Sequence, residues 1–407
     1  MRAVVLCAAL AAFLTPARAR GQVLMVTESE ALARLSADGP RARAARAAVE
    51  LARVDVVAAA RWPNPRVTWD RESVAGVTEH MVTVAQPLPI TGRRGLDVQA
   101  ASAMVGASAS RADDEIRRLR ADLRVAFADL AAAQVREHEL TAARDRLRDV
   151  AELLAKREAA GDAAGFDRLR ADREVLDIDT DRALAASDRA RAQATVASFF
   201  SDATDPTRLV AVVASRAPVT PPSVDALLER AETARGELLA LRREVDAARL
   251  AERAADRRRI PEPELVAGTK SSTAAGGDVG SVITAHATIP LFDRGRPERA
   301  LAVARGAQAE TRAAAFRTVL RGQIGALRAA VVDRRELADR YRAQAVNRAD
   351  QIERIAQISY DAGERSILEL LDAYRTGASA RIRQAALDAA ARQAEIELEF
   401  ASGWEIQ

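Results

Sequence analysis

Two hydrophobic patterns follow one another along this chain. Over residues 67–88, apolar and polar residues alternate, which is the period of a β-strand. Residues 93–160 contain no proline, and their leucines recur mostly at steps of three, four or seven, as in a helix that packs in a coiled coil. The pattern predicts a strand hairpin at about residues 64–90 that leads into one helix of about 68 residues, roughly 100 Å long.

A short segment rich in proline and glycine, residues 86–95, joins the hairpin to the helix. Proline cannot donate a hydrogen bond to a sheet or sit inside a helix, and glycine permits turns that a side chain would block. A similar segment recurs about 200 residues later, which indicates an internal repeat. The residues that mark the two strand–helix junctions are Pro87, Pro89, Gly92, Pro290, Asp293 and Gly295.

Each repeat is expected to contain a helix, a strand hairpin and a long helical hairpin. The first repeat covers residues 20–200, with its strand hairpin at about 64–90. A linker with little periodicity, residues 201–222, leads to the second repeat, residues 223–407. The strand hairpin of the second repeat lies at about residues 262–291.

The helical pattern predicts six helices, each continuous. Thr27 and Glu30 have the spacing of a capping box at the start of the first helix. The predicted helices cover residues 27–61, 93–160, 165–200, 224–259, 296–360 and 366–402.

The first residues have the features of a secretion signal. Arg2 supplies a positive charge, residues 4–14 are apolar but too short to span a bilayer, and residues 17–19 form an A-x-A cleavage site. We therefore expect residues 1–19 to be a cleaved signal peptide. Its removal would also remove Cys7, the single cysteine, and leave a mature chain without disulfides.

Composition refines this picture. The chain is 49% hydrophobic but only 3% aromatic, and much of the apolar content is alanine, which favours long packed helices over a thick core. The net charge is +3, and no basic run with interleaved aromatic residues marks a nucleic-acid surface. A nucleic-acid partner is therefore not expected.

Four predicted strands per chain cannot close a barrel. Each strand has about 9 to 11 residues, which is enough to cross a bilayer when the strand is tilted. Strand edges that stay open in lipid leave backbone groups without hydrogen-bond partners. Closure needs several copies, and three copies provide twelve strands. Trp62 and Trp69 are candidates for an aromatic belt at the lipid interface, although a lone tryptophan near a strand end is equally consistent with ordinary packing.

At these motifs the chain resembles the TolC family of outer-membrane efflux proteins, most closely its CzcC-like subunits. The resemblance rests on Asn64-Pro65, on both junctions, and on residues 360–372 near the end of the second long helix. It implies a mainly α-helical fold with a β-barrel part. The family forms a homotrimer with a long periplasmic α-helical tunnel and a twelve-stranded transmembrane β-barrel, located in the outer membrane of a Gram-negative bacterium.

The resemblance also implies a function and partners. Such a trimer is the channel of a tripartite efflux or secretion system, a passive conduit for metal ions or drugs from periplasm to exterior. It spans outer-membrane lipid and docks on a periplasmic adaptor protein and an inner-membrane pump. The two helix–helix turns are then candidates for the tunnel tip and for adaptor docking. Their residues are Gly161, Asp162, Gly363, Glu364 and Arg365.

Catalytic and metal chemistry are not expected. His80, His138 and His286 fall in separate predicted elements without metal-ligand spacing. No Ser-His-Asp set or phosphate-binding glycine loop stands out. We therefore expect neither an enzyme nor a bound cofactor. The alternative to a channel is a periplasmic coiled-coil scaffold or adaptor without a membrane barrel.

Overall fold

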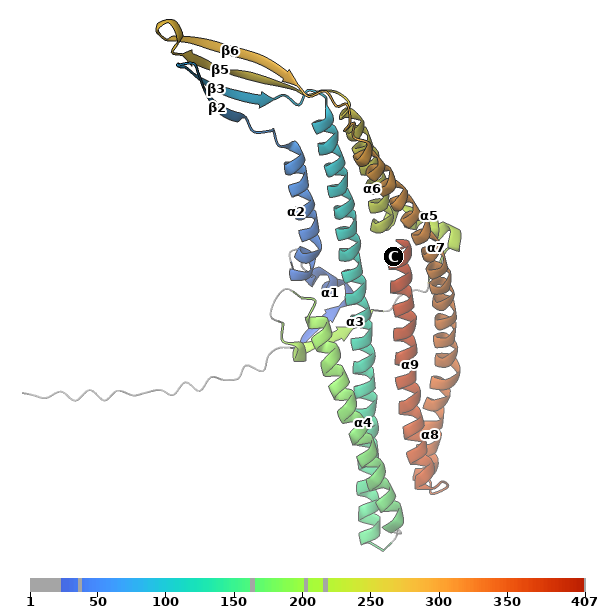
Figure 1. Ribbon diagram of the computed structural model, residues 1–407. Helices are drawn as coiled ribbons and strands as arrows, with labels where there is room; N and C mark the ends of the chain where they lie inside the picture. The colour runs from blue at the N-terminus through green and yellow to red at the C-terminus, as the bar shows by residue number, and fades with distance from the viewer. Residues whose placement is uncertain (1–22, 36–38, 162–164, 201–203, 215–218, 406–407) are drawn as a thin grey trace, which may run out of the picture.

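The computed structural model describes residues 23–35, 39–161, 165–200, 204–214 and 219–405. The molecule is elongated, with a sheet of four strands at one end and helices along the rest of its length (Figure 1). We call these two ends the sheet end and the tip end. The expected signal peptide, residues 1–19, lies outside the described residues.

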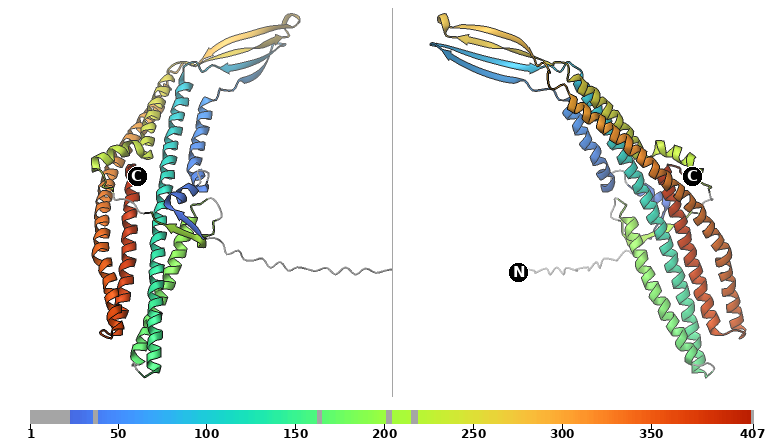
Figure 2. Two further views of the ribbon diagram at one scale, coloured as in Figure 1. Left: turned by 180° about the vertical axis from the view of Figure 1, so that it is seen from behind. Right: turned by 45° about the vertical axis from the view of Figure 1, so that its right-hand side comes forward.

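The helix α3 (Arg93–Ala159) runs along most of the molecule, as the proline-free leucine pattern predicts. Towards the sheet end it packs against α2 (Pro40–Ala60) and α6 (Gly236–Arg257). Towards the tip end it packs against α4 (Gly165–Ala197) and α9 (Ile367–Ser402). One long helix is therefore flanked on each side by two shorter helices placed one after the other (Figures 1 and 2).

The second long helix follows the predicted span of residues 296–360 but is not a uniform α-helix. It consists of α7 (Arg296–Tyr341), a π-helical turn (Arg342–Val346) and α8 (Asn347–Asp361). α7 packs against α6 and α9, and α8 packs against α9. A π-helical turn widens the helix locally by one residue, and the sequence pattern gave no sign of it.

Both predicted strand hairpins form, and they join in one antiparallel sheet. Its order is β2 (Arg66–Val74), β3 (Val77–Pro87), β5 (Pro263–Ser272) and β6 (Asp278–Ala287). The central contact, β3 with β5, connects the two halves of the chain. The sheet is therefore a structure that neither repeat makes alone.

The prediction of one helix over residues 27–61 is wrong. Thr27 caps a helix as expected, because its hydroxyl accepts from the Glu30 N–H at 3.3 Å and its own N–H donates to the Glu30 carboxylate at 2.8 Å. That helix, α1 (Glu28–Arg34), has only seven residues, and α2 begins separately at Pro40.

A second small sheet also departs from the prediction. β1 (Leu24–Thr27) pairs in parallel with β4 (Leu209–Val212), which lies in the expected linker of residues 201–222. Four residues are too few for a visible alternation, so tertiary contact decides this pairing. The strands pack against α3 and α4, where Leu123, Phe127 and Leu209 are buried.

The predicted helix over residues 224–259 is divided in two. α5 (Val224–Ala234) ends at Arg235, whose extended backbone separates it from α6. The Asp114 carboxylate of α3 accepts from the Arg235 guanidinium and from the Gly236 N–H, both at 3.1 Å. α5 and the small sheet occupy the middle of the molecule, between the sheet-end and tip-end helices, which we call the equatorial region.

The helix contacts are thin and rich in alanine. At the sheet end Ala45, Val49 and Ala112 form one small cluster, and Leu241 packs against Ala309 and Ala313 in another. Larger apolar side chains gather in the equatorial region and towards the tip. None of the helices in the described part of the chain is both long and apolar enough to cross a bilayer.

Candidate functional site

The strand register gives the four-stranded sheet two chemically different faces. Val67, Val84, Ala267 and Ile283 stand side by side across the strands, and alternate positions along each strand share that face. Exposure of its large apolar side chains ranges from 44% for Val82 to 77% for Val279. We call this the apolar face: Val67, Trp69, Val82, Val84, Leu265, Ala267, Val279 and Ile283.

The opposite face of the sheet carries most of its charge. Lys270 and Glu79 form an ion pair on it at 2.5 Å, and Arg66 lies 4.0 Å from Glu264. We call this the polar face: Arg66, Thr68, Asp70, Glu72, Glu79, Glu264, Lys270 and Asp278. One apolar and one polar face are what a barrel wall between lipid and a water-filled channel requires.

Both outer strands have an unpaired edge in the described chain, because β2 pairs only with β3 and β6 only with β5. Such edges expose backbone donors and acceptors, which cannot stay unpaired in lipid. All neighbouring strands are antiparallel and their number is even, so β6 of one copy would run antiparallel to β2 of the next.

The helices also form layers that have two open edges, one at each side. At the sheet end their order is α2, α3, α6, α7, and at the tip end it is α4, α3, α9, α8. In each layer an element of the first half forms one edge and an element of the second half forms the other. Both edges expose apolar side chains. They are Leu51, Val54 and Val57 on α2, Leu169, Leu176 and Leu184 on α4, and Leu301, Val303, Ile352, Ile355 and Ile358 on α7 and α8.

The first junction has the proline and glycine positions that the sequence indicates. β3 ends at Pro87, Pro89 lies in the connecting turn, and Gly92 caps α3 with φ 76°. Glu262 holds this turn, because its carboxylate accepts from the Thr91 hydroxyl at 2.8 Å and from the Arg93 guanidinium at 3.3 Å. The entrance to the second hairpin is thereby fixed to the exit of the first.

The second junction needs its glycine for two reasons. Gly295 caps α7 with φ 73°, and a Cβ atom there would lie 2.3 Å from the Ala255 carbonyl oxygen. Asp293 accepts from the Gly295 N–H at 3.2 Å, and Pro290 lies in the preceding turn. The backbone of this turn therefore passes directly over the end of α6.

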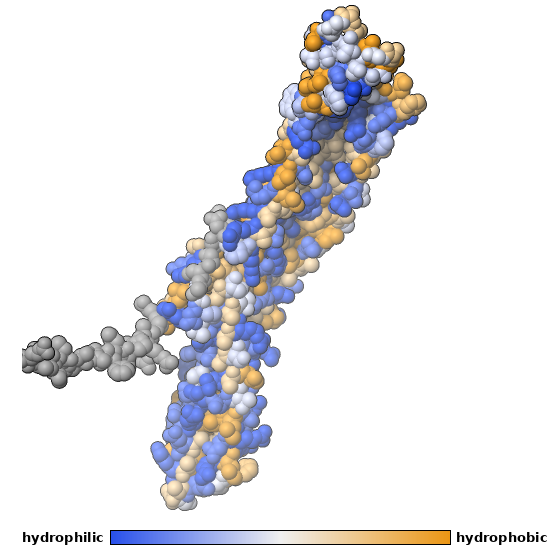
Figure 3. Space-filling view, turned by 60° about the vertical axis from the view of Figure 1, so that its left-hand side comes forward, coloured by the Kyte–Doolittle hydropathy of each residue, from blue (hydrophilic) through white to orange (hydrophobic). Residues whose placement is uncertain are grey.

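Large apolar side chains are exposed around both junctions. Phe292 is 96% exposed, and the Arg94 guanidinium covers the Trp62 ring at 4.9 Å. Trp69 lies farther along the apolar face and stacks on His80, with 6.1 Å between ring centroids. Figure 3 shows hydrophobic residues at the surface of the sheet end, above a mainly hydrophilic helical body. We call the exposed side chains at the junctions the junction collar: Trp62, Ile90, Ile289, Leu291 and Phe292.

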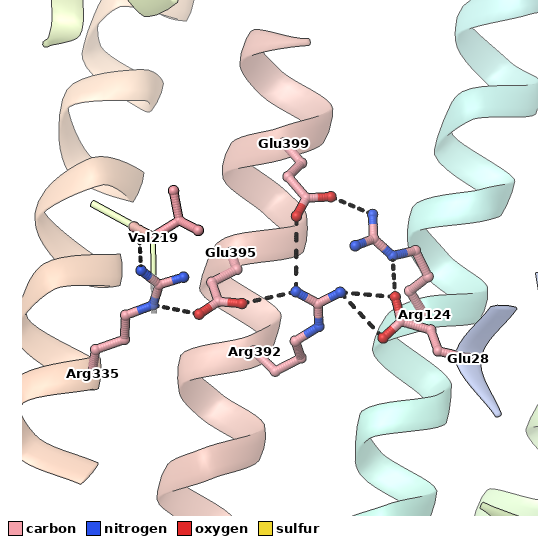
Figure 4. Close-up of polar contacts among 7 residues, drawn as sticks. All are labelled: Glu28, Arg124, Val219, Arg335, Arg392, Glu395 and Glu399. Atoms are coloured by element: carbon pink, nitrogen blue, oxygen red, sulfur yellow. Dashed lines mark hydrogen bonds and ion pairs between the residues drawn. The ribbon is translucent and has the colours of Figure 1, made fainter. Parts of the chain in front are cut away.

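A network of largely buried ion pairs, with side chains 6–19% exposed, lies in the equatorial region (Figure 4). Arg392 of α9 donates to the Glu28 carboxylate at 2.8 and 3.1 Å and to Glu395 at 2.8 Å, and it lies 3.8 Å from Glu399. Arg124 of α3 donates to Glu28 at 2.6 Å and also contacts Glu399. The network thus ties the start of the first repeat to the last helix of the second.

The same network extends to α7. Arg335 donates to the Glu395 carboxylate and to the Val219 carbonyl oxygen. Burial alone raises the pKa of Glu28, but the nearby guanidinium groups of Arg392 and Arg124 outweigh it and hold that pKa below its ordinary value. Three arginines and three glutamates balance each other in this largely buried cluster, so the loss of any one leaves a charge without compensation.

A second ion-pair network lies closer to the tip. Arg381 of α9 donates to Glu139 of α3 at 2.6 Å and to Asp350 and Glu353 of α8 at 2.7 and 2.9 Å. Arg146 of α3 reaches the same Glu353 at 3.1 Å. Sequence analysis missed both networks, because their members are up to 364 residues apart and no local spacing marks them.

The two predicted tips lie close together at the end opposite the sheet (Figure 1). Gly161 has φ 82° and Gly363 has φ 75°, and an added Cβ atom would meet nothing within 4 Å at either position. Asp162 lies outside the described residues. Both glycines are exposed, so their backbone geometry, not packing, favours glycine there.

The other two tip residues shape the second turn. The Glu364 and Arg365 N–H groups donate to the Ser359 carbonyl oxygen at 2.8 and 3.3 Å and close the end of α8. The Arg365 guanidinium donates to Glu369 at 2.9 Å. Glu364 and Arg365 are both exposed, so the turn presents charge to the surroundings. Among the described residues, no group of three or more His, Cys, Asp or Glu side chains has a metal-binding arrangement.

Comparison with known proteins supports this description. Residues 227–404 match the family described as Outer membrane efflux protein. A comparison with curated proteins gives no match. Three similar solved structures are the outer membrane channel CmeC of Campylobacter jejuni, the outer membrane protein VceC of Vibrio cholerae and the open-state outer membrane channel MtrE of Neisseria gonorrhoeae.

These similarities extend over the whole molecule. CmeC is 14% identical with a TM-score of 0.75, and the match covers 92% of this chain and 85% of CmeC. VceC is 17% identical with a TM-score of 0.71, covering 93% of this chain and 97% of VceC. MtrE is 15% identical with a TM-score of 0.71, covering 92% of this chain and 88% of MtrE. The chain has the fold of an outer-membrane channel subunit.

The resemblance to TolC-like channels is therefore confirmed, and so is the mainly α-helical fold with a β-barrel part. The channel-subunit fold explains why one chain combines a two-faced sheet with helices of such length.

Proposed function

We propose that this protein is the outer-membrane channel of a tripartite efflux or secretion system, a passive conduit that carries metal ions or drugs from the periplasm to the exterior. The observation that carries the proposal is the matching edge structure of the sheet and of both helix layers. In the sheet and in each helix layer, the edge formed by the first half of one chain could meet the edge formed by the second half of another copy. Such head-to-tail contacts form a ring when the rotation from copy to copy closes, and closure leaves no strand edge open to lipid.

In this ring three copies would give twelve strands and, at each level, twelve helices. The apolar face would meet lipid, the polar face would line the channel, and Trp62 and Trp69 would lie towards the membrane interface. The copy number of three rests on the family resemblance, since the edges alone require only closure. Export by a cleaved signal peptide, residues 1–19, brings the chain to the outer membrane.

Head-to-tail assembly can be tested by cross-linking, because the mature chain is expected to lack cysteine. A Leu176→Cys, Ile355→Cys double variant places one thiol on the α4 edge and one on the α8 edge. A bismaleimide should link the double variant up to a trimer, whereas each single variant should stay monomeric on a denaturing gel. Efficient dimers from a single variant would show a two-fold contact and refute the ring.

The membrane topology separates the channel from the soluble scaffold. A cysteine at Ala75, in the β2–β3 turn, should react with an impermeant maleimide in intact cells. A cysteine at Gly161, at the tip, should react only after the outer membrane is opened. Recovery of the chain in the soluble periplasmic fraction, or equal labelling of both sites in intact cells, would contradict the channel proposal.

The tip turns are proposed to form the periplasmic mouth and to dock an adaptor protein, which in turn connects to an inner-membrane pump. Gly161, Asp162, Gly363, Glu364 and Arg365 are the residues proposed for this contact. The support is the exposure of Gly161, Gly363, Glu364 and Arg365, the charge of Glu364 and Arg365, and the distance of the turns from the sheet, which the length of α3 sets at roughly 100 Å.

A Gly161→Val, Gly363→Val variant tests this docking role. Valine at a positive φ costs about 1–3 kcal/mol of local strain and redirects each turn, while nothing packs against the added side chain. The trimer should still reach the outer membrane, but resistance to the metal salts or drugs that the wild-type strain exports should be lost. A Gly322→Val variant, in the middle of α7 with open space around it, is the control. Normal resistance with the tip variant would refute the assignment.

A further inference from the structure

One charged side chain interrupts the apolar face of the sheet. Arg71 follows Trp69 by two residues on β2, and it stands beside His80 of β3 and, one strand farther, Ser271 of β5. It is the one aspartate, glutamate, lysine or arginine among the strand residues of that face, all of which the structure describes. Arg71 is exposed, and no hydrogen bond or ion pair joins it to another described residue.

The position of Arg71 along the strand coincides with a membrane boundary, if the sheet forms the proposed barrel. β5 gives the height of the Arg71 row above the junction, because Ser271 lies in that row and Pro263 begins the strand. From Pro263 to Ser271 the strand advances eight residues, about 26 Å. At the usual strand tilt of about 40°, this corresponds to roughly 20 Å along the membrane normal, close to the apolar band of about 25 Å in such barrels. Arg71 therefore lies at the level of the headgroups on the side of the hairpin turns.

A neighbouring copy would not neutralise this arginine. In the proposed ring, β6 of the next copy lies beside β2, and its residues on the same face carry no carboxylate. They are Val279, Ser281, Ile283, Ala285 and Ala287. The Arg71 guanidinium is therefore open to an anion from outside the protein.

The surrounding side chains indicate what kind of anion fits. The Arg71 guanidinium, the His80 ring and the Ser271 hydroxyl supply hydrogen-bond donors in one row across three strands. His80 is held against Trp69 by stacking, with an angle of 9° between the rings. Towards the junction the next row begins with Trp69 and Val82, and the row after it begins with Val67 and Val84. A ligand that joins a phosphate to acyl chains matches both parts.

We propose that Arg71, His80 and Ser271 form a binding site for the phosphate group of a membrane lipid in the leaflet on the hairpin-turn side. Trp69 and Val82 contact the upper part of its acyl chains. The site rests on the proposed function, because it requires the apolar face to meet lipid. It would fix the height of the barrel in the membrane at three equivalent positions around the ring.

Native mass spectrometry of the detergent-solubilised assembly tests this site with defined lipids. Dipalmitoyl phosphatidic acid supplies the phosphate, and dipalmitoyl glycerol has the same chains without it. The wild-type protein should retain phosphatidic acid and not diacylglycerol. Arg71→Gln should weaken that retention roughly tenfold or more, because a charge-assisted hydrogen bond is lost. Arg66→Gln, on the polar face of the same strand, is the matched control and should bind like the wild type.

Several outcomes would overturn the inference. Equal retention of the two lipids would show apolar adhesion alone, and displacement of phosphatidic acid by millimolar inorganic phosphate would show a site for the free ion. Wild-type retention by Arg71→Gln, or an equal loss with Arg66→Gln, would exclude Arg71 as the ligand. If the protein is instead soluble and monomeric, the proposed channel function fails. If the trimer is intact but lipid binding does not depend on Arg71, only this inference fails.

Discussion

Arg392 is the arginine whose replacement should cost most in the equatorial network. Its side chain is 16% exposed and makes short contacts with Glu28 and Glu395, next to the almost fully buried Glu399. In an Arg392→Met variant, three carboxylates would share the two remaining arginines. Removing one partner of a buried ion pair costs about 3–5 kcal/mol, mainly because the other charge stays buried without compensation.

This cost can be converted into a melting temperature. The unfolding entropy is about 2.1 cal/mol/K per residue. For a chain of 407 residues, the free energy of unfolding therefore falls by roughly 0.85 kcal/mol for each kelvin near the melting temperature. The Arg392→Met variant should therefore melt roughly 4–6 °C below the wild type. Thermal circular dichroism of the assembly in detergent measures this difference directly.

A matched control separates burial from the mere loss of an arginine. Arg249 of α6 also has two acidic neighbours, Asp246 at 3.8 Å and Glu310 at 3.6 Å, but its side chain is 64% exposed. Exposed pairs contribute about 0–1 kcal/mol, so Arg249→Met should lower the melting temperature by about 1 °C or less.

The pH dependence gives a second check on the same variant. Without Arg392, one buried carboxylate should bind a proton more readily, so the difference from the wild type should shrink as the pH falls from 7 towards 4. A melting temperature for Arg392→Met equal to that of Arg249→Met, or a difference that does not change with pH, would refute this reasoning.

Three further predictions concern close contacts and titration. A Cβ atom at Gly268 would lie 2.0 Å from the Val82 carbonyl oxygen of β3, so Gly268→Ala should reduce the trimer yield on native gels. A Cβ atom at Gly280, also on the polar face, would meet nothing within 4 Å, so Gly280→Ala should not reduce the yield. A Cβ atom at Gly236 would lie 2.0 Å from the Ser110 carbonyl oxygen of α3, so Gly236→Ala should lower the melting temperature by about 1–4 °C, with Gly322→Ala near the wild type. Because the folded-state pKa of Glu28 is lowered, its stabilisation is complete above its ordinary pKa and is lost as the pH falls through the folded value. The melting temperature of Glu28→Gln should consequently fall less than that of the wild type between pH 7 and pH 3, and an equal fall would contradict the ion-pair role.

Much of the fold was predictable because its signals are local. The strand–helix junctions at Pro87 and Pro290, the capping box at Thr27 and the helix-ending glycines each follow from backbone geometry that a few residues dictate. The length of α3 followed equally from a proline-free apolar pattern over one segment. The internal repeat presented the junctions and the helix-ending glycines twice, so the order of the strand hairpins and long helices was visible before any contact was known.

Tertiary structure decided the features that depend on residues far apart in the chain. The pairing of β3 with β5, the parallel pair of β1 and β4, and the break at Arg235 depend on which segments meet, and a short segment carries no sign of its distant partner. The ion-pair networks depend on the same encounters, since Glu28 and Arg392 are ordinary charged residues until the fold brings their side chains within 2.8 Å of each other. Local backbone preference thus determined the strand hairpins, the junctions and the length of α3, while contacts between distant segments determined how these elements were joined and where the shorter helices divide.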